Sequence, residues 1–209
     1  MNPDFKCLKT KFLARFAILL ELSYAMFAAL FTASAEEEHF LKLTSQMLTS
    51  SSTLADFSGL IDEQEKLPPT GKPEKGWKIN SQGWSQFPFS ATVDFDEPKP
   101  LNAIWIFDTF GTGEIVIEVF STESNEWLVI TNYGCDKFMA WTRIAIERLS
   151  SKTRLTFKSS GAGVAEIAIS QFTAKEWEYV KKEQEDKIIA AKEREMALQK
   201  AKEELSAMS

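Results

Sequence analysis

The chain has 209 residues, a formal net charge of −6 at pH 7, and hydrophobic and charged fractions of 44% and 26%, which are proportions of a globular protein. One histidine, His39, and two cysteines, Cys7 and Cys135, exclude a multi-histidine metal centre, a zinc ribbon and a disulfide-stapled mini-protein, and they leave a serine or cysteine hydrolase only His39 as its base. The acidic balance argues against a nucleic-acid binder that works through phosphate contacts.

Residues 1–35 have the three parts of an export signal. Basic side chains precede an apolar run from Phe16 to Thr32, and Ala33-Ser34-Ala35 is a small-x-small cleavage site followed by the acidic Glu36. This order predicts cleavage after residue 35 and a mature chain that is secreted, periplasmic or at the cell surface. The alternative is an uncleaved anchor, because the apolar segment is just long enough to span a bilayer.

The segment from Glu63 to Phe89 contains four prolines and three glycines, which is typical of a long loop. Trp77 and Trp84 lie in it, separated by a lysine and two side-chain amides: Lys78, Asn80 and Gln82. Exposed indoles beside amides would form a platform for a sugar, because apolar C–H faces stack on aromatic rings while amides bond hydroxyl groups. The alternative is that both indoles are buried as a plug at one end of the domain.

Seven short runs between Ser90 and Ser170 alternate apolar and polar residues and end at Gly, Ser, Asn or Pro. They are Ser90–Phe95, Ala103–Asp108, Glu114–Phe120, Glu126–Thr131, Trp141–Glu147, Thr153–Lys158 and Val164–Ser170. Glu97-Pro98 is predicted to turn the chain between the first two, and Leu41–Met47 is a candidate for one more strand. Strands without intervening helices predict an antiparallel sandwich or barrel. The strand tryptophans Trp105, Trp127 and Trp141 are expected in its core.

The composition changes abruptly at Ala174. Residues 174–209 lack Gly and Pro and are rich in Ala, Glu and Lys, which predicts a helix. Thr173 and Glu176 have the spacing of a capping box. A heptad seam can be drawn along the helix, but Lys187 and Arg194 interrupt it, so the coiled-coil pattern is weak. The helix is either solvated and anchored only near its N-terminus, or a weak homo-oligomerisation stem.

An ordered series of short motifs resembles a discoidin-like domain, the coagulation-factor C-type or galactose-binding-like fold, over about residues 41–172. The motifs are Leu43-Thr44-Ser45-Gln46-Met47-Leu48-Thr49, Gly59-Leu60-Ile61-Asp62-Glu63-Gln64, Pro69-Thr70-Gly71, Trp77, Ala91-Thr92-Val93-Asp94-Phe95, Glu126-Trp127, Trp141, Thr153-Arg154-Leu155 and Ala165-Glu166-Ile167. The look-alikes are modules of secreted bacterial proteins that act at glycans. The resemblance therefore implies an eight-stranded jelly-roll sandwich that binds sugars at loops on one end.

The resemblance also implies a structural calcium between a loop like that of Asp62 and an acidic residue like Glu166. Two carboxylates and loop carbonyls can supply hard oxygen ligands for such an ion. The alternative assigns Asp62 to turn capping and Glu166 to an edge position. Arg154 is either a ligand-binding residue or a strand arginine paired with a carboxylate such as Asp94.

The sequence thus predicts a mainly β protein: a signal peptide at 1–35, a discoidin-like antiparallel jelly-roll β-sandwich at 36–173, and a charged C-terminal α-helix at 174–209. Its expected function is that of an exported, non-catalytic carbohydrate-binding module that recognises a glycan or cell-surface polysaccharide. The alternative is a structural or assembly protein with a protein-binding β-sandwich head and an oligomerising helical stem. No nucleic acid is expected as a partner, and a membrane only if the leader is uncleaved. The candidate site residues are Trp77, Lys78, Asn80, Gln82, Trp84 and Arg154 for the ligand, and Asp62 and Glu166 for calcium.

Overall fold

The computed structural model of the chain describes residues 38–67, 69, 71–74, 87–109, 111 and 113–207, with side chains up to residue 203. The chain divides into two compact units, Met1–Glu37 and Glu38–Ser209, and the described residues all belong to the second. The predicted export signal therefore lies outside the described residues. No helix in the described part has both the length and the apolar character that a membrane span requires.

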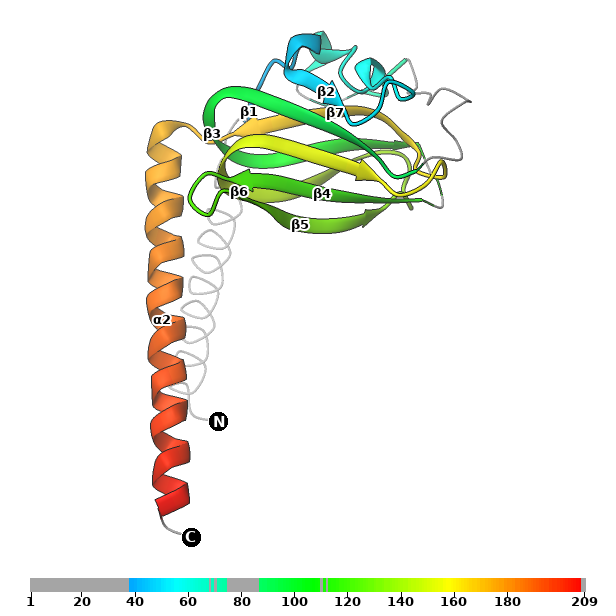
Figure 1. Cartoon of the computed structure of the whole chain (residues 1–209). Coiled ribbons are helices and arrows are strands. Elements are labelled where there is room, and N and C mark those ends of the chain that lie inside the picture. The colour runs from blue at the N-terminus through cyan, green and yellow to red at the C-terminus, as the bar shows by residue number, and fades with distance from the viewer. Residues whose placement is uncertain are drawn as a thin grey trace, which may run out of the picture. The chain divides into compact units, whose positions relative to one another are not determined.

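The predicted mainly β, antiparallel fold with a C-terminal helix is confirmed (Figure 1). In the described residues the strands are β1 (His39–Phe40), β2 (Leu48–Ser50), β3 (Phe89–Thr109), β4 (Glu114–Ser121), β5 (Glu126–Gly134), β6 (Phe138–Phe157) and β7 (Val164–Gln171). Three short 3-10 helices, η1 (Ser45–Met47), η2 (Ser58–Leu60) and η3 (Gln64–Lys66), precede β3, and α2 (Ala174–Ala207) follows β7. The predicted strand at Leu41–Met47 is wrong, because η1 occupies its second half.

β3 and β6 are long bent strands, and each combines two of the predicted ones. The predicted turn at Glu97-Pro98 is a bend within β3 and does not separate two strands, because β3 stays paired with β6 on both sides of it. The pairing shifts register between Asp94 and Lys99, which is where the strand curves back on itself in Figure 1. An irregularity of this kind bends a strand without ending it, and prolines are tolerated there because no ladder hydrogen bond is lost.

The two bends fold one seven-stranded sheet over itself into two layers. The strand order is β1-β7-β3-β6-β4-β5, with β2 paired to β3 outside this order, and the sheet is not closed. The first layer contains β2, the N-terminal half of β3, the C-terminal half of β6, β4 and β5. The second contains β1, β7, the C-terminal half of β3 and the N-terminal half of β6.

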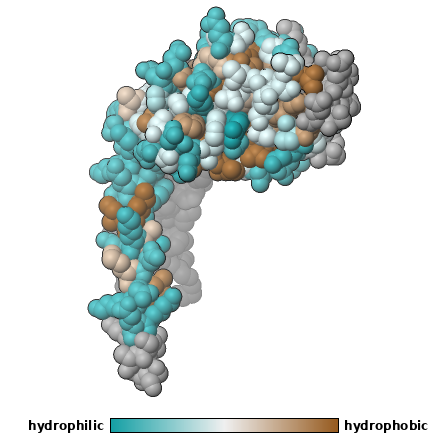
Figure 2. Space-filling view, viewed as in Figure 1, coloured by the Kyte–Doolittle hydropathy of each residue, from teal (hydrophilic) through white to brown (hydrophobic). Residues whose placement is uncertain are grey.

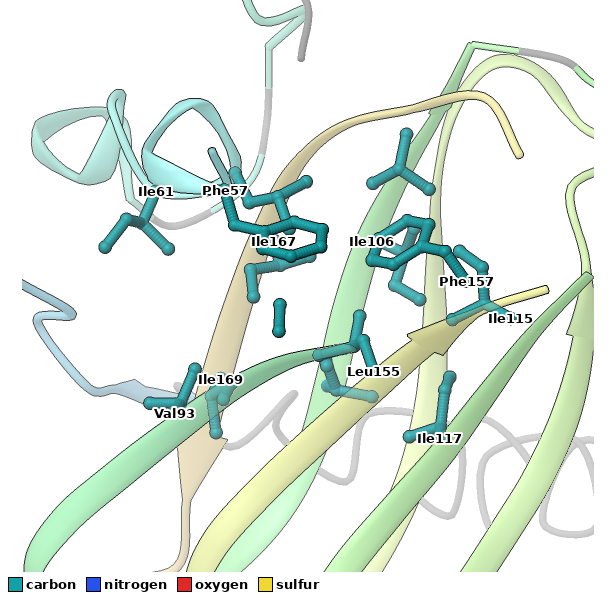
Figure 3. Packing of buried hydrophobic residues seen from close by; sticks show 14 of the residues in the cluster. Phe57, Ile61, Val93, Ile106, Ile115, Ile117, Leu155, Phe157, Ile167 and Ile169 are labelled. Carbon is teal, nitrogen blue, oxygen red and sulfur yellow. The ribbon is translucent and has the colours of Figure 1, made fainter. Parts of the chain in front are cut away.

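The hydrophobic core lies between these layers (Figure 3). Six of its members that are at most 1% exposed come from both layers: Val93, Ile117 and Leu155 from the first, and Ile106, Ile167 and Ile169 from the second. Phe57, in the segment before β3, stacks on Phe157 with ring centroids 5.4 Å apart and closes the core from that side. Each such aliphatic side chain stabilises the fold by about 1.5–3 kcal/mol on burial.

The three strand tryptophans are half-buried, so their expected place in the core is wrong. The indole N–H of Trp105 donates to the Glu38 carboxylate at 2.7 Å, and that of Trp141 donates to the carbonyl of Gly71 at 2.7 Å. Trp127 lies beneath a guanidinium group instead. A buried indole N–H requires a hydrogen-bond acceptor, which the aliphatic core does not offer but the outer faces do.

The predicted helix and its capping box are confirmed. The Thr173 hydroxyl accepts a hydrogen bond from the Glu176 amide at 3.3 Å, and the Glu176 carboxylate accepts one from the Thr173 amide. Trp177, in the first turn, stacks on Phe172 with ring centroids 6.0 Å apart. Every side chain from Glu185 to Glu203 is exposed, and Figure 2 shows the surface of α2 as mostly hydrophilic with small hydrophobic patches.

Candidate functional site

Five of the predicted ligand-binding residues lie outside the described residues: Trp77, Lys78, Asn80, Gln82 and Trp84. The two flanks of their loop are described. On one flank, the carbonyl of Gly71 accepts the Trp141 hydrogen bond near the start of β6, in the second layer. On the other, Phe87 packs edge-on against Phe89 at 4.9 Å, and Phe89 is paired with the last residue of β6, in the first layer. The described flanks therefore both lie at the end of the sandwich where β6 begins and ends.

Arg154 lies on the outer face of the first layer, in the C-terminal half of β6. Its guanidinium donates two hydrogen bonds, of 2.7 and 2.8 Å, to the carboxylate of Glu118, its cross-strand neighbour on β4. The same guanidinium lies 4.0 Å from the centroid of the Trp127 ring. The pairing with Glu118 replaces the expected pairing with Asp94, whose carboxylate binds Lys152 one row away.

Hydroxyl groups surround this ion pair. Thr92 is directly across from Arg154 on β3, and the hydroxyls of Ser90 and Thr156 are 2.9 Å apart. Thr156 also lies 3.4 Å from the Glu118 carboxylate. Thr92 is three residues beyond Phe89, or about 10 Å along the strand. The face therefore adjoins the end of the sandwich at which β3 begins.

Such a face has the chemistry that sugars require. The ion pair fixes both side chains in place before any ligand arrives, so little side-chain freedom is lost on binding. Two of the five guanidinium N–H donors bind Glu118, and the others point elsewhere. The indole provides an apolar surface beside them. The side chains of Arg154 and Glu118 keep 28% and 13% of their exposure, so the pair is partly accessible to solvent.

The second predicted site involves acidic side chains of β7 and of the residues directly before η3. Glu166 is 2% exposed, Glu63 is 5% exposed, and Gln64 joins them by donating 2.8 Å and 2.9 Å hydrogen bonds to the Glu166 carboxylate and the carbonyl of Ile167. Burial, and then the charges of Asp62 and Glu63, raise the pKa of Glu166 to about 8, against the hydrogen bonds that lower it. The cluster therefore contains a carboxyl group that holds its proton at neutral pH.

Of the two predicted calcium ligands, Asp62 contributes through its charge to the raised pKa of Glu166. Glu166 has β3 beside it on one side only, because β1 reaches just Ser170 and Gln171 of β7, and this agrees with the expected edge position. Its Oε2 is buried without a hydrogen-bond partner among the described residues, which fits a cation as well as a proton. The described residues contain no group of three His, Cys, Asp or Glu side chains placed to hold a metal. Calcium here would need main-chain carbonyls or water as its further ligands.

A groove of about 570 Å³ lies between the first turns of α2, the β4–β5 turn and the bend of β6. Its apolar lining consists of Val119, Leu128, Leu149, Trp177 and Ile188. Gln184 crosses one side of it and donates a 3.0 Å hydrogen bond to the carbonyl of Glu147. Sequence reasoning missed this groove, because it depends on the bend that makes β6 one strand instead of two.

Neither a family model nor a curated protein matches this sequence. Among solved structures, the chain is similar to the family 32 carbohydrate-binding module of NanJ from Clostridium perfringens in complex with galactose, with 14% identity, a TM-score of 0.47, and 64% of this chain and 99% of that chain covered. It is also similar to the C-terminal domain of a chitobiase from Bacteroides fragilis (16% identity, TM-score 0.48, 64% and 97% covered). A third is a Clostridium perfringens CBM32 module in complex with GlcNAc-α-1,4-galactose (17%, 0.45, 66% and 97%). These neighbours include modules with the discoidin-like, galactose-binding-like fold, the class that the sequence resembles.

Proposed function

We propose that this chain is an exported, non-catalytic carbohydrate-binding module. It binds a glycan or cell-surface polysaccharide through Trp77 and Trp84, which would stack on sugar rings, and through the outer face that carries Arg154. The observation that carries the proposal is the position of Arg154, which is held by Glu118 over the ring of Trp127. A guanidinium so fixed donates paired hydrogen bonds to vicinal hydroxyl groups next to an apolar ring.

The matched pair of variants Arg154→Gln and Lys152→Gln tests this proposal. Both remove a cation and an ion pair from the same strand and face, but only Arg154 lies over an indole. A glycan array on residues 36–209 first identifies the sugar, which is then titrated against each protein. Arg154→Gln should weaken binding by about 1–3 kcal/mol, and Lys152→Gln should leave it nearly unchanged.

If Arg154→Gln bound the glycan as tightly as the wild type and Lys152→Gln do, the outer face would not be part of the site. An array without any bound glycan would overturn the proposed function. Recovery of the bound sugar as intact molecules, checked by mass spectrometry, tests the non-catalytic part of the proposal. Cleaved sugar would contradict it.

Export makes a separate prediction. Basic residues, an apolar run and Ala33-Ser34-Ala35 in that order predict a mature chain that begins at Glu36. Intact-mass measurement of the protein recovered from its host checks this directly. A membrane-embedded chain that still begins at Met1 would show that the leader is an anchor.

Calcium bound through Asp62 and Glu166 is the cofactor part of the proposal. It is supported by the buried Oε2 of Glu166 and by the charge of Asp62, which contributes to the raised pKa of Glu166. A bound ion would stabilise the fold by about 2.7 kcal/mol at a hundredfold excess over its dissociation constant. The melting temperature should therefore fall on addition of a chelator, and Glu166→Gln should abolish that fall. Identical melting with calcium and with chelator would remove the ion.

A further inference from the structure

The outer edge of β5 is the most open edge of the sheet. β5 is the last strand in the sheet order, and in the described residues it pairs with β4 alone (Figure 1). Half of its backbone N–H and C=O groups therefore face away from the sheet along a strand of nine residues. Such an edge is a template for another strand unless the protein blocks it.

The other open edges of the described sheet are blocked, and this one is much less so. β1 and β2 have only two and three residues. The N-terminal half of β6 contains Arg143, fixed by Glu38 and Asn102, and has positive φ angles at Met139 and Glu147. β5, in contrast, has no charged residue between Trp127 and Gly134, and its single irregularity is a register shift at Ile130. Charges, short strands and distorted backbone are the usual protection of an edge.

Exposed aliphatic side chains gather beside this edge. Leu128 and Val129 of β5 are 37% and 60% exposed, although they stand on opposite faces of the strand. Leu128 also lines the groove, where Leu149 and Ile188 are 38% and 55% exposed. The surface thus combines unpaired backbone with apolar side chains on both sides, which is what a strand-adding partner requires.

We propose that two copies of this chain associate through β5, in an antiparallel pairing centred on Leu128. The faces of β5 on which the side chains lie determine this register. Trp127 and Val129 are opposite Phe120 and Glu118 on the outer face, while Leu128 is opposite Val119 on the inner face. Pairing about Leu128 therefore places Val129 against the partner's Trp127 and Leu128 against the partner's Leu128, next to the groove. The ladder ends at the irregular Ile130.

The charges favour a second copy as the occupant. Glu126 is the one charged residue of the segment that pairs in this register, residues 126–130, and it lies opposite the partner's Ile130. No like charges therefore meet, although the chain is acidic overall. Both copies use the same surface patch, as a two-fold symmetric interface requires. This pairing brings Val129 against the partner's Trp127, whose ring also belongs to the proposed glycan site, and it does not involve α2, where the heptad seam is interrupted.

Sedimentation of the mature chain over a range of concentrations tests the proposal. The wild type should change from one-chain to two-chain mass with rising concentration. Val129→Lys should weaken the association by about tenfold or more, because a lysine on an edge strand opposes the addition of another strand. Leu198→Lys is the matched control, since Leu198 is an equally exposed aliphatic residue (64%) on α2, and it should leave the association unchanged.

A wild type that stays at one-chain mass would overturn the proposal. So would an association that Leu198→Lys abolishes and Val129→Lys does not, which would place the contact on the helix. Unchanged melting temperatures of both variants show that either effect is not a loss of fold, and both positions are exposed enough to accept lysine. A heavier species that contains a different protein would also contradict it.

Discussion

Glu166 lies in β7, where every residue from Val164 to Ser170 is buried, and this burial determines how the group titrates. Its pKa is raised from 4.5 to about 8, first by desolvation. The native state therefore binds the proton more tightly than the unfolded chain does. Between these two pKa values the native state holds more protons, so the free energy of unfolding decreases as the pH rises. The stabilisation is complete below pH 4.5 and is lost as the pH passes about 8.

The prediction is a pH-dependent loss of stability that belongs to this one residue. In the presence of a chelator, the free energy of unfolding by urea should fall from pH 5 towards pH 8, with a contribution of about 1.4 kcal/mol for each unit of pKa difference. Glu166→Gln should remove most of that slope. The exposed Glu178→Gln on α2 is the control and should retain it. Parallel curves for the wild type and Glu166→Gln would show that another group titrates.

The strands and the helix could be read from the sequence because both depend on local pattern. Period-2 alternation located every strand from Ser90 onwards, and a change of composition located the start of α2. The continuity of β3 and β6 could not be read in this way. Pro98 is a turn signal when it is considered alone. In the structure, β3 and β6 bend there and stay paired on both sides of the bend.

The candidate sites were less predictable, because they join segments far apart in the chain. The grouping of Asp62 with Glu166 as calcium ligands rests on a resemblance and not on their spacing. The partner of Arg154 is set by register: Glu118 is directly opposite it, whereas Asp94 is opposite Lys152. The tryptophans were assigned to the core by their size, but the need of an indole N–H for an acceptor placed Trp105 and Trp141 on outer faces.

Helix α2 makes a prediction at the scale of one element. Its contacts with the sandwich are confined to its first turns, through Trp177 and Gln184, while residues 185–203 are exposed. Removal of residues 190–209 should therefore lower the helical circular dichroism but change the free energy of unfolding of the sandwich by only about 0.5 kcal/mol. Trp177→Ala, which removes the half-buried anchor, should cost about 1–3 kcal/mol in the full-length helix. Equal losses from the two changes would mean that the distal helix packs on the sandwich.

At the scale of the whole molecule, the two layers are not separable units. β3 and β6 each contribute one half to the first layer and one half to the second, and they pair along both halves. The core between the layers is filled from both sides by side chains such as Leu155 and Ile167, each 0% exposed. If β3 and β6 unfold in one layer, the other layer also loses support from these two shared strands. The sandwich should therefore unfold in one cooperative transition.

One substitution in each layer tests this. Leu155→Ala in the first layer and Ile167→Ala in the second each leave a cavity in the same core and should each cost about 2–5 kcal/mol. Because the layers share β3 and β6, both variants should shift a single urea transition in which tryptophan fluorescence and far-ultraviolet circular dichroism coincide. Leu198→Ala on the exposed part of α2 is the control and should leave the midpoint unchanged. If either core variant splits the transition, so that one probe changes before the other, the bent strands do not couple the layers and the sandwich unfolds in two parts.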